Sequence, residues 1–287
     1  MSIRTAEKTV TFASLMLLAL LFLFTIPGQA LGADGSDKDL QKPASLKSLQ
    51  NIERSEDVFK DADSKIIDIR KDALQEAAIS LGARGGLAHR TYQIRKLLKS
   101  RAAHLNKIFD FRQLLIPAPS GLLIEPPIIS EAIDNMLIGD GGTQAAVADR
   151  VFEIGVNARI VSAPRTWNQY LERSYSNVEK PPQLLRPENK EERENWKKWV
   201  ALGWAQGVAQ ADAIFEEDLA RLRADYEGMV RYRKLLAQGM VSQPYALQRD
   251  RGITGGGHVL RVGDRSISLT GLPQLKSGHE EWRPASR

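Results

Sequence analysis

The chain has 287 residues, of which 43% are hydrophobic and 26% charged, and its formal net charge is +5. These values suit a globular protein of one or two domains, and the basic residues are interleaved with acids instead of forming the concentrated patch that nucleic-acid binding usually needs. The absence of cysteine excludes disulfides, thiolate metal sites, a cysteine nucleophile and acylation on cysteine.

Residues 1–33 have the three-part layout of a secretory signal peptide. Arg4 and Lys8 precede an apolar run from Phe12 to Ile26, and small residues follow it. The alternative is a transmembrane anchor, but the run is short for a bilayer span. We therefore predict export, cleavage between Ala30 and Asp34, and a mature chain that lies outside the cytoplasm without a membrane-spanning helix.

The next segment, residues 34–61, is polar and weakly periodic, and we interpret it as a tether that is partly helical towards its end. From residue 62 an apolar stripe follows helical spacing. Three glycines, Gly82, Gly85 and Gly86, interrupt the stripe. They fit either a break between two helices or one continuous helix that packs closely on a neighbour, and we predict the continuous helix.

The middle of the chain changes character. Residues 111–132 are rich in proline and contain short β-branched runs, and apolar residues lie among turn residues in 139–167. Both patterns predict short strands or hairpins. A connector punctuated by prolines follows at residues 178–192.

The longest helical pattern runs from Glu188 to Met240 without a proline, and Pro187 suits its first helical position. Gly203 and Gly207 lie on one face of this helix, which predicts a smooth groove for a neighbouring helix. Tryptophans at helical spacing are usually core residues or interface anchors, and less often a ligand platform. The candidate partner-contact residues are therefore Trp196, Trp199, Gly203, Trp204 and Gly207.

The glycine triplet Gly255–Gly257 raises the question of a phosphate loop. A phosphate loop is followed by a helix whose N–H groups bind the anion, and here a strand pattern follows. The stretch also lacks the Lys-Ser/Thr pair of a P-loop. We predict that the triplet only turns the chain, and that Val259–Val262 and Arg265–Thr270 form a hairpin with its turn at Gly263-Asp264.

No HExxH, GxSxG, SxxK or CxxC motif occurs, and the histidines are not spaced as metal ligands. We therefore predict no catalytic residue, metal, cofactor or small-molecule ligand. The expected fold class is α+β and predominantly helical, with long helices packed against short antiparallel strands or hairpins. The expected domain extends over residues 62–287.

An ordered series of segments runs through residues 62–283: AAISLGARGGLAHR, LNKIFDF, APRTWNQYL, GWAQGVAQADAIFEEDLARLRADYEGMVRYRKLLAQGMVSQPY, GITGGG, DRSISLTGLPQL and EWR. This series resembles the DotC family, the TraI-like proteins of type IVB secretion and I-type conjugal transfer. The motifs are not catalytic, but a series of this length and order is specific.

The resemblance implies a periplasmic structural subunit of the outer-membrane core complex, which acts with DotD-like and DotH-like proteins. Members of the family are typically lipoproteins acylated on a cysteine. This chain has none, so we expect its contact with the outer membrane to come through partners. Two alternatives stay open: a periplasmic enzyme whose site is not visible in the sequence, and a DNA-handling protein of the transfer channel.

Overall fold

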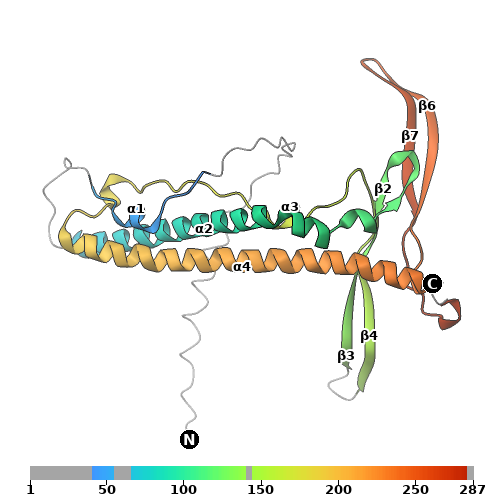
Figure 1. Ribbon diagram of the computed structural model, residues 1–287, viewed down its shortest axis with the longest axis horizontal. Coiled ribbons are helices and arrows are strands. Elements are labelled where there is room, and N and C mark those ends of the chain that lie inside the picture. Colours follow the sequence, from blue (N-terminus) through green and yellow to red (C-terminus); the bar gives the residue numbers. More distant parts are fainter. Residues whose placement is uncertain (1–40, 55–65, 140–143, 283–287) are drawn as a thin grey trace, which may run out of the picture. The chain divides into compact units, whose positions relative to one another are not determined.

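The computed structural model describes residues 41–54, 66–139 and 144–282 (Figure 1). The predicted signal peptide and most of the predicted tether lie outside these residues. The described residues form long helices and antiparallel strands, which confirms the predicted α+β class with a predominance of helix.

Two long helices, α2 (Ile66–Ile108) and α4 (Lys190–Ala237), pack along each other. Arg70 contacts Glu192 near the start of both helices, and Arg90 contacts Asp212 further along both. The helices are therefore parallel, as Figure 1 shows. Helix α2 passes through its three glycines without a break, so the prediction of a continuous helix is confirmed.

Helix α4 begins two residues later than the sequence predicts. Its N-cap is Asn189, whose side chain accepts a hydrogen bond from the backbone N–H of Glu192 at 2.8 Å. The Glu192 carboxylate in turn accepts one from the N–H of Glu188 at 2.8 Å. These bonds satisfy backbone donors that a helix start leaves without partners.

Part of the segment predicted as a tether packs against the helices. The short helix α1 (Leu46–Gln50) is capped by Ser45, and the side chains of Leu49 and Ile52 are buried. They join the apolar cluster formed by the first halves of α2 and α4. Residues 42–54 thus belong to the folded unit, which extends from Lys42.

The strands form three separate antiparallel sheets. The smallest strands, β1 (Ile116–Pro117), β2 (Leu123–Glu125) and β5 (Arg159–Val161), form one sheet in the order β1-β2-β5. Two-stranded ribbons make up the others: β3 (Ile128–Gly139) with β4 (Gln144–Val156), and β6 (Tyr245–Gly256) with β7 (Val259–Gly271). The remaining short elements are η1 (Phe111–Leu114), η2 (Pro119–Gly121), α3 (Asn168–Leu171), η4 (Gln183–Leu185) and η5 (His279–Glu281).

The C-terminal ribbon corrects one prediction. Its turn lies at Gly257-His258, not at Gly263-Asp264, so the two runs predicted as separate strands form the single strand β7. The glycine triplet does turn the chain, as predicted. Gly263, with a positive φ of 72°, is the unpaired residue between the pairs Gly252–Asp264 and Ile253–Val262, and Gly252 has a φ of 71°. Glycines in both strands let these irregularities compensate, and the pairing continues beyond them.

Candidate functional site

The predicted glycine pair of α4 receives a helix of the same chain. A Cβ atom added to Gly203 would collide with the backbone carbonyl of Ile79, and one added to Gly207 with that of Ala83. On the facing side, Gly82 and Gly86 of α2 lie equally close to the α4 backbone. Both helices thus contribute two small residues at a spacing of four, and their backbones touch along this seam.

The three predicted tryptophans surround the same seam. Trp196 is fully buried, and its Nε1–H donates to the carbonyl oxygen of Leu49 at 3.1 Å, which fixes α1 on α4. Trp199 and Trp204 are half-buried against the same apolar cluster. The Trp204 ring also lies 5.3 Å from the ring of His89. Contacts within the chain explain the burial of these three tryptophans. Their contact with another protein stays a prediction.

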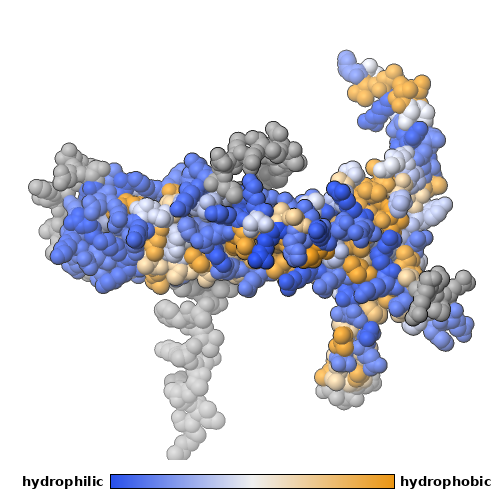
Figure 2. Space-filling model, viewed as in Figure 1, coloured by the Kyte–Doolittle hydropathy of each residue, from blue (hydrophilic) through white to orange (hydrophobic). Residues whose placement is uncertain are grey.

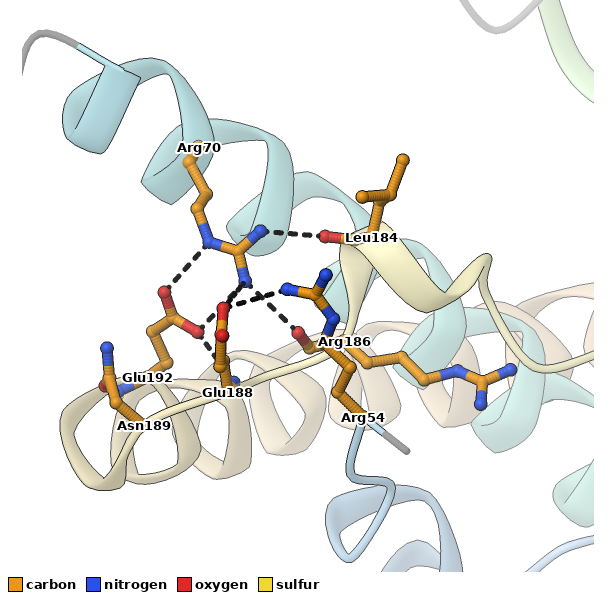
Figure 3. A network of polar contacts seen from close by, with 7 residues as sticks. All are labelled: Arg54, Arg70, Leu184, Arg186, Glu188, Asn189 and Glu192. Carbon is orange, nitrogen blue, oxygen red and sulfur yellow. Dashed lines mark hydrogen bonds and ion pairs between the residues drawn. The ribbon is translucent and has the colours of Figure 1, made fainter. Parts of the chain in front are cut away.

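A network of polar contacts closes the start of the helix pair (Figure 3). Arg70 of α2 donates to the Glu192 carboxylate at 3.0 Å and to the carbonyl of Leu184 at 3.0 Å, while Arg54 pairs with Glu188 at 2.9 Å. Burial opposes ionisation of Glu192, but hydrogen bonds from Arg70 and the Glu188 backbone outweigh it and lower the pKa of this carboxyl. The network ties α2, α4 and the connector before α4 together.

A second polar cluster joins the small sheet to α4. The buried carboxylate of Glu125 binds Arg159 at 3.2 Å and Arg165 at 2.5 Å. Arg165 also donates to the hydroxyl of Tyr170 and to Asp225, both at 2.6 Å, and Tyr170 donates to Asp225 at 2.7 Å. Burial, together with the bond to Asp225, raises the pKa of Tyr170 to about 12. This hydroxyl therefore stays protonated and donates to the carboxylate.

Next to this cluster, Arg173 makes two bonds of 2.7 Å to the buried carboxylate of Asp218. The arginines of the two clusters line a pocket together with Tyr170, Asp218 and Asp225, and in this pocket the arginines contact the carboxylates. Such a bidentate pair fixes geometry, because the planar guanidinium matches both carboxylate oxygens. The cluster thus holds the segment around α3 on α4, and its acids are already paired with arginines.

The ribbon β3–β4 is fixed at one end and exposed along the rest. Arg231 of α4 donates to the Ile129 carbonyl at 2.6 Å and to the Glu131 carboxylate at 3.0 Å, and Gly228 leaves room for the backbone of Ile129. Beyond this base, Met136 and Val147 are 57% and 65% exposed. The register places them opposite each other on one face of the ribbon.

The ribbon β6–β7 has the same design. Ser120 donates to Gln248 at 2.6 Å near its base, and Val241 pairs with Leu275 where the two ends of the ribbon meet. Further along, Ile253 and Val262 lie opposite each other and are 68% and 75% exposed. Figure 2 shows hydrophobic residues on the surfaces of both ribbons. The sequence pattern predicted hairpins but not these exposed aliphatic faces.

In residues 41–54, 66–139 and 144–282, no group of three or more histidine, aspartate and glutamate side chains is placed to hold a metal ion. Among the helices of the same residues, none combines the length and the apolar composition that crossing a membrane requires.

Comparison with known proteins places the chain in a family. The model of the TraI family, described as type IV secretory system, conjugal DNA-protein transfer, matches residues 68–284. The chain belongs to this TraI family. No match was found among curated proteins.

The match to the TraI family leaves out α1, Arg54 and the first two residues of α2. It includes the glycine seam of α2 and α4, the arginine–carboxylate cluster and both ribbons. The type IV secretion and conjugal transfer assignment of the sequence resemblance is thereby confirmed.

Proposed function

We propose that this TraI-family chain is a DotC-like structural subunit of the outer-membrane core complex of a type IVB secretion or conjugative transfer system. The observation that supports this role most directly is the pair of exposed aliphatic ribbons. A two-stranded ribbon alone is only marginally stable in water, and clustered exposed aliphatic residues usually mark a contact surface. Both ribbons are firmly attached to the body at their bases, so they suit contacts with neighbouring subunits.

In this proposal the helix pair is the rigid support and the ribbons are the contacts. The glycine seam and the two polar networks hold α2, α4 and the small sheet in one arrangement. The ribbons extend from this arrangement and help to assemble DotD-like and DotH-like subunits. The role is structural and not enzymatic, and it needs no cofactor, small-molecule ligand or direct contact with nucleic acid.

The test is recovery of the native complex from cells that carry the whole transfer system. One variant combines Met136→Lys with Val147→Lys, and another combines Ile253→Lys with Val262→Lys. We expect each to fold and to lose most of the co-purifying core subunits. The matched control is Leu202→Lys, which changes a leucine of α4 that is 51% exposed. Full recovery of the complex with both ribbon variants would contradict the proposal.

Localisation forms a separate part of the proposal: export to the periplasm and association with the outer membrane through partners. An acyl chain adds about 0.8 kcal/mol of membrane affinity per buried CH₂, and a chain without cysteine cannot gain this from acylation of a cysteine. We expect the mature protein to sediment with outer membranes only when its partners are present. Fractionation with and without them, combined with N-terminal sequencing, tests this. Outer-membrane retention in the absence of partners would contradict it.

A further inference from the structure

The two ribbons differ in charge although they share a design. The described strands of β3–β4 carry four carboxylates and one arginine, whereas residues 245–271 carry four arginines and two aspartates. One ribbon is therefore acidic and the other basic. Each also presents exposed aliphatic side chains, so the two surfaces match in hydrophobicity and are opposite in charge.

Three of the four carboxylates lie beside the exposed aliphatic pair of β3–β4, and the fourth, Glu131, pairs with Arg231. Asp134 and Asp149 lie at the same level of the ribbon, between the pairs Ile133–Arg150 and Asn135–Ala148, and Asp134 has a positive φ of 51°. Like charges opposite each other destabilise a pair of strands unless a cation lies between them. Within the described residues, neither aspartate makes an ion pair.

Glu153 lies four residues along β4 from Asp149, which places both carboxylates on the same face of the ribbon. Met136 and Val147 occupy this face as well. Asp149, Met136 and Val147 lie nearer than Glu153 to the Gly139–Gln144 end of the ribbon, and all four side chains are exposed. The face thus presents an aliphatic patch with three carboxylates beside it.

The basic ribbon supplies the complementary groups. Ile253, Leu260 and Val262 share one face and are 68%, 71% and 75% exposed. Arg261 alternates with Leu260 and Val262 and therefore lies on the opposite face of the ribbon, while Arg251 lies at a shift of register between Asp250 and Gly252. In the described part of the chain neither arginine forms an ion pair. Arginines without a carboxylate partner on one ribbon thus match carboxylates without a cation on the other.

We infer that β3–β4 of one copy of this chain packs against β6–β7 of a second copy, so that the acidic ribbon meets the basic ribbon and their exposed aliphatic side chains are covered. The contact joins two different surfaces, so it is heterologous. In a pair of copies, one keeps a free β6–β7 ribbon and the other a free β3–β4 ribbon, so the contact can repeat from copy to copy in a closed ring or an extended array. This inference rests on the proposed function, because it names what covers the ribbons in the assembly.

The lack of cysteine permits a direct test by disulfide cross-linking. Val147→Cys and Val262→Cys are introduced into separate copies of the full chain, which are distinguished by different tags and produced together in cells that carry the whole transfer system. The expected product is a cross-link between the two different variants. Neither variant produced alone should form a disulfide-linked dimer. As a control, Leu202→Cys should form no cross-link with either variant.

Charge reversal tests the pairing of the two ribbons. Asp149→Lys with Glu153→Lys should reduce the mixed cross-link by at least about tenfold, because it gives both ribbons a net positive charge. Arg251→Glu with Arg261→Glu should do the same. A copy with reversed acids combined with a copy with reversed arginines should restore the cross-link. Restoration separates a specific contact from a loss of folding.

Three results would overturn the inference. The first is the absence of a mixed cross-link in the complete system, and the second is a dimer of Val147→Cys with itself, which indicates a symmetric contact. The third is a mixed cross-link that is insensitive to charge reversal. If ribbon variants lose the other core subunits although no mixed cross-link forms, the proposed function stands and this inference fails. If the mixed cross-link forms but the core subunits are recovered normally with the ribbon variants, this inference stands and the proposed function fails.

Discussion

Gly203 of α4 lies directly against the backbone carbonyl of Ile79 in α2, with no space for a side chain between them. The same relationship recurs one turn later between Gly207 and Ala83. Because the obstructing atoms belong to the backbone, they cannot move aside as a flexible side chain would. The two helices would have to separate to accommodate even a methyl group.

We therefore expect Gly203→Ala to lower the free energy of unfolding by about 1–3 kcal/mol, the usual effect of overpacking. Alanine favours a helix over glycine by about 1 kcal/mol, so propensity alone predicts the opposite sign. The double change Gly203→Leu with Gly207→Leu should destabilise the chain further. Urea unfolding followed by circular dichroism measures both effects.

Gly256→Ala is the matched control for these glycine substitutions. A Cβ atom added at Gly256 meets no atom within 4 Å, and the backbone there does not require glycine. Its unfolding midpoint should match that of the unchanged chain. Equal stability of the Gly203 and Gly256 variants would show that the helices are not in backbone contact.

The hydrogen bond from Trp196 to Leu49 gives a second prediction. Trp196→Phe keeps an aromatic ring but leaves the buried Leu49 carbonyl without its donor, which costs about 1–3 kcal/mol. Residues 42–54 should then become sensitive to limited proteolysis, because this bond helps to hold α1. Trp199→Phe changes a half-buried ring of the same cluster, and in this variant the segment should stay as resistant to proteolysis as in the unchanged chain. Equal cleavage rates in the two variants would contradict this role of Trp196.

The sequence was sufficient to predict the long helices, because their apolar stripes keep helical phase over many turns. It also identified Gly203 and Gly207 as the face that receives a helix. Periodicity defines a face but does not identify the neighbour. The available signal was the same spacing of four at Gly82 and Gly86, which marks the partner helix within the chain.

The strands were harder to predict, for two physical reasons. Gly263-Asp264 has the composition of a tight turn, but it lies at a shift of register within one continuous pairing, next to Gly252 of the opposite strand. The contact between Glu125 and Arg165 spans 40 positions of the sequence and has no local pattern. Exposed aliphatic residues on a ribbon resemble core residues in the sequence, so the exposed faces of the ribbons were not recognised.

The glycine triplet Gly255–Gly257 yields a prediction about ligands. It occupies the tip of the β6–β7 ribbon and strand β7 follows it, so no helix start directs backbone N–H groups at an anion. We expect no saturable binding of ATP or GTP in isothermal titration calorimetry. Micromolar binding that is lost on Gly256→Asp would mean that the loop is a phosphate site after all.

The contact of Arg70 with Glu192 predicts how stability depends on pH. The lowered pKa of Glu192 means that its carboxylate is favoured in the folded chain over the unfolded chain, where the pKa of glutamate is about 4.3. The resulting stabilisation is fully present above that unfolded value and is lost as the pH falls through the lower folded value. Acidification from about pH 5 to pH 3 should therefore lower the melting temperature more steeply for the unchanged chain than for Glu192→Gln.

Glu194→Gln is the control for this pH dependence, since Glu194 is exposed on the same helix and makes no ion pair with the described residues. Its curve of melting temperature against pH should follow that of the unchanged chain. At neutral pH, Glu192→Gln should be less stable than Glu194→Gln, because only the first removes a charged partner of Arg70 and weakens the acceptor for the Glu188 N–H. Two variant curves that coincide across the whole range would mean that this network contributes nothing to the acid sensitivity of the fold.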